Sequence, residues 1–276
     1  FFFKQKTAYE ISLGLVGSEM CIRDSPHTIQ SIFLPTTHGT ASEVTMWGTL
    51  WNMEEEKKYS ISHPSLYPSV AILDGNLTLS LPLDISISTV MDALSHSFES
   101  IWNKKANHTS TDFAISAICS ILENGPALKE NPDDLDTRNN LLKAATVAGL
   151  AFSNTTTAAA HSMSYPLTIH YGMPHGVASS ISLIPLLEIN GEFIKEPLNR
   201  ICNNNELTYD KLKETIKAIP QGVIPYTLDE WGIPENQLTK LAAESFTKGR
   251  MDNCLLYTSD AADERSSVDL GGRRII

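Results

Sequence analysis

The chain has 276 residues and an ordinary apolar fraction of 42%, which allows one large domain or two ordinary ones. Its net charge of −11 argues against a nucleic-acid-binding surface, and no apolar stretch reaches the about 18 residues that a membrane span needs. The four cysteines show neither a CxxC pair nor a disulfide-like spacing, so we expect a reduced, cytoplasmic protein.

The two ends of the chain differ from the rest. Residues 1–25 open with three phenylalanines, lack any capping or periodic pattern, and fit no signal peptide. Residues 1–25 and 254–276 both resemble translated sequencing-library adapters, in the order and orientation that a library insert would give. We therefore expect no native packing role for either end, and we interpret residues 26–253 as a fragment of a longer protein.

Residues 26–80 have the pattern of strands. Short runs rich in strand-forming residues occupy 31–34, 44–51 and 70–73. Residues 36–43 form a loop of small residues between the first two runs. Its backbone N–H groups and hydroxyls could bind a phosphate, although most turns rich in threonine and glycine are only turns.

From about residue 81 the pattern becomes helical. Asp84 is a plausible N-cap for the first helix. Clusters of glycine and proline at 124–126, 171–174 and 220–222 are expected to separate helices. We predict a helical domain over residues 81–253, with helices at 84–103, 109–123, 133–152, 155–164, 175–189, 209–218 and 236–248.

Four polar residues of this helical region could converge on a metal ion. Asp92 and His96 are four residues apart and so share one face of a helix. His161 lies in a segment of small residues, and His175 follows Pro174 at the start of another helix. Each residue alone is more commonly a surface, capping or core residue. As one set on facing helices, a carboxylate and three imidazoles suit Fe²⁺ or Zn²⁺.

Four segments together resemble one known family. They are PTTHGTASEVT at 35–45, the stretch 68–82, DALSHSFE at 92–99, and HSMSYPL through PHGVA at 161–178. In this order they resemble the iron-containing (group III, metal-dependent) alcohol dehydrogenases, and they span most of residues 26–253.

The resemblance implies an α/β plus all-α fold of dehydroquinate synthase-like architecture. Residues 26–80 would be the remnant of a Rossmann-like dinucleotide-binding domain, and 81–253 a helical-bundle metal-binding domain. The implied metal ligands are Asp92, His96, His161 and His175. The implied cofactor-binding residues, for NAD or NADP, are Thr36, Thr37, Gly39, Thr40, Ser42, Lys58 and Leu77.

The implied activity is hydride transfer between a nicotinamide and an aldehyde or alcohol whose oxygen a Lewis-acidic metal activates. Many members have a proton-relaying histidine where this chain has Tyr165, and His170 is a possible substitute. Ala41 stands where a glycine is common, a small change if the backbone there has a negative φ. The family's glycine-rich pyrophosphate loop would lie upstream of Pro26, so we expect the chain by itself to be inactive.

Two other functions stay open. One is a metal- and NAD-dependent lyase of the dehydroquinate-synthase type, whose metal set usually includes a glutamate and two histidines. The other is a non-catalytic helical metal-binding module. The resemblance implies a small alcohol or aldehyde as substrate and does not resolve which one. Residues 57–64 and 164–166 faintly resemble members that reduce phosphonoacetaldehyde, but Lys57, Lys58 and His63 are more simply interpreted as solvated loop residues. A homodimer or larger assembly is typical of the family.

Overall fold

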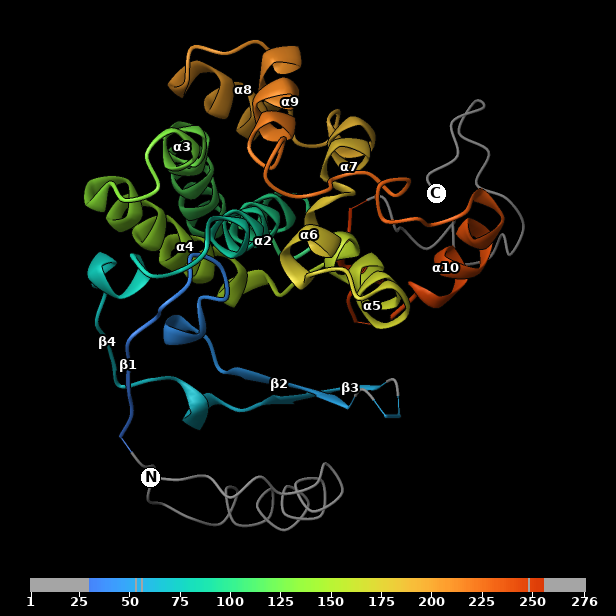
Figure 1. The fold of residues 1–276 in the computed structure, drawn as a ribbon, viewed down its shortest axis with the longest axis horizontal. Helices are drawn as coiled ribbons and strands as arrows, with labels where there is room; N and C mark the ends of the chain where they lie inside the picture. Colours follow the sequence, from blue (N-terminus) through green and yellow to red (C-terminus); the bar gives the residue numbers. More distant parts are fainter. Residues whose placement is uncertain (1–29, 53, 56, 248, 256–276) are drawn as a thin grey trace.

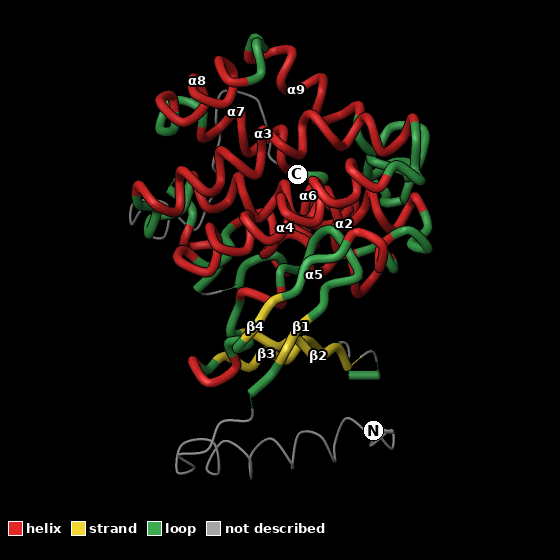
Figure 2. The backbone as a smooth tube through the Cα atoms, turned by 90° about the vertical axis from the view of Figure 1, so that its left-hand side faces the viewer, coloured by secondary structure: helices red, strands yellow, loops and turns green. Residues whose placement is uncertain are grey.

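The computed structural model describes residues 30–52, 54–55, 57–247 and 249–255. Within these residues all strands precede residue 72, and helices make up most of the chain after them. The strands form a small layer at one end of a helical bundle (Figures 1 and 2). The molecule is therefore mostly helical with two short two-stranded sheets.

One buried helix, α2 (Leu83–Ile101), runs through the middle of the bundle (Figure 1). From Ser86 onward nearly every side chain of α2 is buried, including the charged ones. Buried polar residues on a central helix need partners from neighbouring helices. Those neighbours are α3 (His108–Glu130), α4 (Leu135–Thr155), α5 (Ala159–Tyr171) and α6 (His175–Ser180).

Four further helices complete the bundle: the first three lie on the side away from the strands, and the last lies at the flank beside α5 (Figure 1). They are α7 (Leu183–Asn190), α8 (Lys195–Asn204), α9 (Tyr209–Ala218) and α10 (Leu238–Glu244). The main apolar core joins α2, α3 and α4 to α7, α8 and α9, and a smaller one lies under α10. No single helix in the described part of the chain is both long and apolar enough to cross a membrane, and one bent pair, α6–α7 with α8, passes by length and composition alone.

The strands form two separate pairs. Strand β1 (Ile32–Phe33) lies parallel to β4 (Val70–Ala71), whereas β2 (Trp47–Asn52) and β3 (Lys57–Ser62) form an antiparallel hairpin. Arg138 of α4 donates hydrogen bonds to the carbonyl oxygens of Thr78 and Leu81. This buried guanidinium fixes the connection that leads from the strands into α2.

Most predicted helices are present, with several corrections. Asp84 is not the N-cap of α2: Pro82 takes that position, and Asp84 lies in the first turn. The predicted break at 124–126 is wrong, because α3 continues through Pro126. The buried Asn124 side chain there is held by Ser120 and Asn140. The predicted helix 175–189 divides into α6 and α7.

Two elements were not predicted. Residues 57–62, interpreted as loop, form β3, because they pair along their whole length with β2. The amphipathic helix α8 also escaped prediction, although it buries Leu198 and Ile201 against the core.

The ends predicted to be foreign lie mostly outside the described residues. Cys254 and Leu255 are described, and both contact the bundle, while the foreign origin of that segment stays a prediction. The Cys254 side chain is buried, and the backbone N–H of Leu255 donates to the Trp102 carbonyl oxygen at the end of α2.

Candidate metal centre

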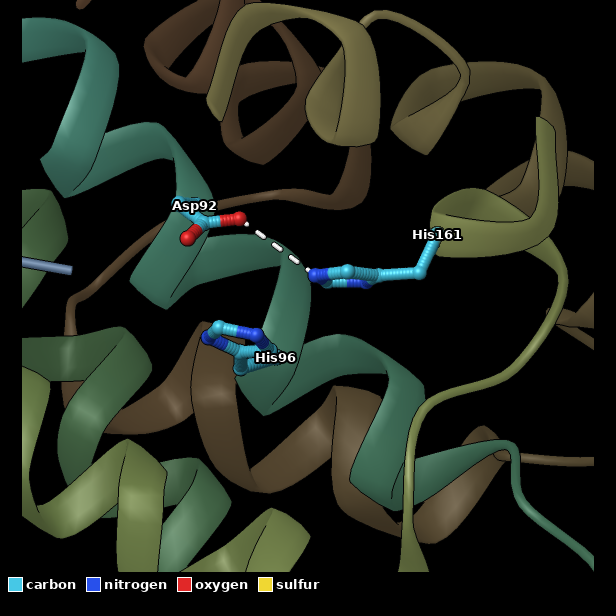
Figure 3. Close-up of side chains that lie close together, drawn as sticks. All are labelled: Asp92, His96 and His161. Atoms are coloured by element: carbon cyan, nitrogen blue, oxygen red, sulfur yellow. Dashed lines mark ion pairs between the residues drawn. The ribbon is translucent and has the colours of Figure 1, made fainter. Parts of the chain in front are cut away.

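Three side chains from two helices meet inside the bundle. Asp92 and His96 lie one turn apart on α2, and His161 reaches them from α5 (Figure 3). One ligand atom from each residue lies within 4.8 Å of the others. Asp92, His96 and His161 are 5%, 6% and 2% exposed, so water solvates none of them well. We call these three residues the buried triad.

The buried triad has nitrogen atoms without hydrogen bonds. His161 Nε2 faces Asp92 Oδ1 at 3.3 Å in an ion pair. Neither His161 Nε2 nor His96 Nδ1 has a hydrogen-bond partner. Buried polar atoms are nearly always paired, and unpaired ones call for an explanation. A divalent cation explains them, because a carboxylate and imidazoles are ligands that iron and zinc accept. The residues present therefore fit the metal that the sequence predicts.

Glu99 holds His161 in place. Its Oε2 atom lies 2.6 Å from His161 Nδ1, and its Oε1 atom accepts the backbone N–H of His161 at 3.0 Å. A carboxylate on Nδ1 leaves Nε2 available to a cation. A hydrogen bond also orients Asp92, because Ser179 Oγ donates to its Oδ1 atom at 2.8 Å. Sequence reasoning assigned no role to Glu99, although residues 92, 96 and 99 follow helical spacing.

The charges of the site depend on burial and on one another. Burial lowers the pKa of His96 to about 4, against the attraction of Asp92, so this ring is neutral at neutral pH. Burial also disfavours a charged His161, but Glu99 and Asp92 raise its pKa to about 9. Although burial alone would raise the pKa of Asp92, the surrounding imidazoles hold it below its ordinary value. A cation entering the site must therefore displace a proton from His161.

His175, the fourth predicted ligand, begins α6 beside the triad. Its ring meets the His161 ring edge-on, with 5.4 Å between centroids. It lines the same cavity, but it lies outside the group of three whose ligand atoms converge within 4.8 Å. Its role as a ligand stays a prediction.

The buried triad opens onto a cavity of about 650 Å³. Its walls come from the 36–43 loop, the β2–β3 hairpin, α2, α4, α5, α6, the connection between α4 and α5, and residues 249–250. Phe152 stacks on the His96 ring at 4.1 Å, and Trp47 stacks on Phe152 at 5.5 Å. These aromatic rings exclude water from one side of the triad.

The 36–43 loop reaches the cavity through only part of its length. Of the predicted cofactor-binding residues, Thr40 and Ser42 line the cavity, whereas Thr36, Thr37 and Gly39 do not. Gly39 packs on α2, where a Cβ atom would lie only 2.5 Å from the Thr89 carbonyl oxygen.

The structure does not bring Leu77 to the cavity, and it describes only the backbone of Lys58. Leu77 lies in a 3-10 helix (Gly75–Thr78) and is 40% exposed outside the cavity lining. The backbone of Lys58 belongs to β3, and its side chain lies outside what the structure describes.

Ala41 has a left-handed backbone, with φ 49°. The expectation that replacing glycine here is harmless was conditional on a negative φ, and that condition is not met. This conformation costs an L-residue roughly 1–2 kcal/mol. The Ala41 methyl group packs where Gly149 of α4 has no side chain, which lets the loop lie close to the bundle.

Tyr165 and His170, the predicted proton carriers, have different surroundings. Tyr165 accepts a hydrogen bond from Arg250, which lines the cavity. His170 is exposed, and its Nε2 atom lies 2.8 Å from Glu244 of α10. The structure therefore links Tyr165 to the cavity through Arg250 and does not bring His170 to it. Sequence reasoning did not identify Arg250.

Two family models match the chain. One, described as iron-containing alcohol dehydrogenase, matches residues 9–75. The other, described as Fe-containing alcohol dehydrogenase family, C-terminal, matches residues 86–268, more than half of the chain. The first range begins before residue 26 and the second ends after residue 253, so the foreign origin of the two ends stays a prediction.

Individual alcohol dehydrogenases and aldehyde reductases are also similar to this chain. Long-chain-alcohol dehydrogenase 1 of Geobacillus thermodenitrificans is 30% identical over 81% of this chain, which spans 58% of that protein. Phosphonoacetaldehyde reductase of Streptomyces viridochromogenes is 31% identical over 60% of this chain and 42% of its own length. A crystal structure of sulfoacetaldehyde reductase from Bifidobacterium kashiwanohense with NAD+ matches with a TM-score of 0.71 and 30% identity, over 84% of this chain and 62% of that one. The predicted fold class is confirmed.

Proposed function

Because the chain belongs to the iron-containing alcohol dehydrogenase family, we propose that the protein encoded by its complete reading frame is a metal-dependent alcohol dehydrogenase or aldehyde reductase that uses NAD or NADP. The observation that carries this proposal is the buried triad, whose nitrogen atoms without hydrogen bonds face a cavity that the 36–43 loop also lines. The metal is Fe²⁺ or Zn²⁺, since the same ligands accept either.

Each residue of the site has its own task. Asp92, His96 and His161 hold the ion, with His175 as the fourth ligand, and Glu99 keeps the His161 ring in one orientation. When bound, the ion supplies Lewis acidity to the substrate oxygen. In reduction, the aldehyde carbon accepts a hydride from NADH or NADPH and the oxygen accepts a proton, which gives an alcohol and the oxidised nucleotide. Thr40 and Ser42, which line the cavity, would contact the cofactor.

Tyr165 is the better candidate to relay the proton. Its hydroxyl group contacts Arg250 of the cavity wall, whereas His170 pairs with Glu244 on an exposed surface. Both matching family models describe alcohol dehydrogenases, so no observation favours the lyase alternative.

The proposal is tested with protein produced from the complete reading frame and loaded anaerobically with Fe²⁺ or Zn²⁺. We expect one ion per chain by elemental analysis and oxidation of NADH or NADPH with short aldehydes. His161→Ala should lose both the ion and turnover, and the exposed His170→Ala should retain the ion. Turnover that survives complete removal of the metal would refute the proposal.

The non-catalytic alternative makes a different prediction. If the metal only stabilises the fold, His161→Ala lowers the melting temperature and the wild-type protein reduces no aldehyde. Circular dichroism and nucleotide oxidation on the same samples separate the two cases.

We also propose a cytoplasmic homodimer or larger assembly that acts on a small molecule. Cys119 and Cys202 are free thiols, as in a reducing compartment. Size-exclusion chromatography with light scattering tests the assembly.

A further inference from the structure

Arg250 puts a positive charge in the wall of the metal cavity. The contacts of its guanidinium within the described residues are with hydroxyl groups and one aromatic ring. It donates to Tyr165, lies 3.5 Å from both Thr157 Oγ1 and Ser60 Oγ, and stands 5.1 Å from the centre of the Tyr165 ring. None of these groups is an anion.

A charge in such surroundings is costly. Burial lowers the pKa of Arg250, and the attraction of Glu99 opposes this only in part. Glu99 is already engaged by two hydrogen bonds to His161. Arg138, which is fully buried, shows the contrast, because three carbonyl oxygen atoms surround its guanidinium. A partly buried guanidinium whose contacts are hydroxyl groups and one aromatic ring is suited to an anion that arrives with a ligand.

The backbone around Arg250 is held firmly. The Asn253 side chain donates to Thr156 Oγ1, to the Thr157 carbonyl oxygen and to the Gly249 carbonyl oxygen. Asp252 accepts the Gly249 N–H at 2.6 Å. Arg250 is therefore anchored to the α4–α5 connection that also lines the cavity, and its position does not depend on a free chain end.

The hydroxyl groups around Arg250 come from three directions. Ser60 belongs to β3, Thr157 to the α4–α5 connection and Tyr165 to α5. A planar carboxylate is satisfied by one guanidinium fork, whereas a group with three oxygen atoms can also accept from hydroxyl groups on other sides.

We propose that Arg250 selects aldehydes that carry a phosphonate or sulfonate group, which it binds together with the hydroxyl groups of Ser60 and Thr157 while the carbonyl end lies at the buried triad. This inference rests on the proposed dehydrogenase function and names its substrate class. Two of the similar proteins are named for such aldehydes, phosphonoacetaldehyde and sulfoacetaldehyde. Arg250 is a specificity residue and takes no part in the hydride transfer.

The test compares four aldehydes with the metal-loaded protein from the complete reading frame: phosphonoacetaldehyde, sulfoacetaldehyde, succinic semialdehyde and butyraldehyde. We expect kcat/KM to be highest for one of the first two. Arg250→Met should lower the ratio of kcat/KM for that aldehyde to kcat/KM for butyraldehyde by about 10- to 100-fold, mostly through KM. Arg250→Lys keeps the charge without the fork and should fall between. Arg200→Met, which removes an exposed arginine, should match the wild-type ratio.

Several outcomes would overturn the inference. It fails if Arg250→Met leaves the ratio of the two kcat/KM values unchanged. It also fails if the wild-type protein prefers butyraldehyde or succinic semialdehyde, or if Arg250→Met raises only the KM for the nucleotide. If the wild-type protein reduces no aldehyde, the proposed function fails, and binding of ethylphosphonate and ethanesulfonate by calorimetry still decides the anion site. Weaker binding of these probes to Arg250→Met and to Arg250→Lys would support the site, and equal binding would reject it.

Discussion

Glu99 illustrates how a residue that touches no substrate can control a metal site. Its carboxylate contacts both Nδ1 and the backbone N–H of His161, and this fixes the ring nitrogen that a cation can use. We expect Glu99→Gln to weaken metal binding by about 10- to 100-fold, because the amide is a poorer partner for the imidazole. Competition with a chelator of known affinity measures this change.

A matched control is Glu43→Gln. Glu43 is also buried, and it accepts a hydrogen bond from Thr146 away from the triad. Equal losses of metal affinity in both variants would mean that Glu99 acts only by maintaining the fold.

His38 predicts a pH dependence of stability. It is fully buried, neither ring nitrogen has a hydrogen bond, and burial, helped by Arg138, lowers its pKa to about 4. Above the ordinary pKa of 6.5 the ring is neutral in both the folded and the unfolded chain. Between about pH 6.5 and 4 only the unfolded chain gains this proton, so the contribution of His38 to the free energy of unfolding, about 3 kcal/mol, is lost over this interval.

Urea unfolding between pH 7.5 and 4 checks this prediction. His38→Leu, which cannot titrate, should show a smaller loss of stability over that interval than the wild-type protein. Identical slopes for the two proteins would contradict a buried, neutral His38.

At the scale of single residues, the sequence predicts those parts of the site that depend on local spacing. Asp92 and His96 share a helix face, and motif order identifies His161 and His175. Arg250 and the role of Glu99 could not be predicted, because their contacts join segments far apart in the chain. The φ of Ala41 likewise depends on how the loop packs on Gly149.

Gly176 sets the closest approach between two helices of the site. A Cβ atom there would overlap the carbonyl oxygen of Ser88 in α2. We expect Gly176→Ala to push α6 away, to lower stability by about 1–3 kcal/mol, and to weaken metal binding because His175 and Ser179 move with α6. Thermal unfolding and chelator competition measure the two effects.

Gly125→Ala is the control for this prediction. Gly125 also lies in a helix, but its added methyl group would meet the flexible Ile219 side chain at 3.2 Å. Helix propensity favours alanine by about 0.5–1 kcal/mol, so this variant should change stability little. If Gly125→Ala lowers stability as much as Gly176→Ala does, the loss does not arise from the close α2–α6 contact.

At the scale of elements, hydrophobic periodicity located the long helices and misjudged features that tertiary contacts decide. The Asn124-Gly125-Pro126 cluster normally ends a helix, yet α3 continues because Asn140 and Ile219 cover it. Strand β3 carries charged and polar residues and becomes a strand by pairing with β2.

At the scale of the whole molecule, the parallel pair β1–β4 is unusually open. Ile32, Val70 and Ile72 are 59%, 46% and 45% exposed. Parallel strands are normally covered on both faces. We therefore expect the 276-residue chain to bind an apolar dye and to self-associate through this surface. Ile32→Lys with Ile72→Lys should reduce both, as monitored by dye fluorescence and light scattering.

Phe193→Lys provides the comparison, because Phe193 is 62% exposed but lies between α7 and α8. An equal reduction by this variant would show that self-association does not depend on the strand surface. The sequence predicted strands at residues 31–34 and 70–73. That these two strands pair with each other could not be predicted, because the composition of a strand does not specify its partner.

The buried triad also has a consequence for the entropy of the chain. Asp92 and His96 are neighbours on one helix, but His161 lies far along the sequence, on α5. An ion bound by both Asp92 and His161 would close a loop of about 70 residues. If it stayed bound in the unfolded chain, it would lower the conformational entropy of that state, as a disulfide does, by an amount equivalent to about 4 kcal/mol. The centre would then act as a reversible cross-link, and a chelator would release it as a reductant releases a disulfide.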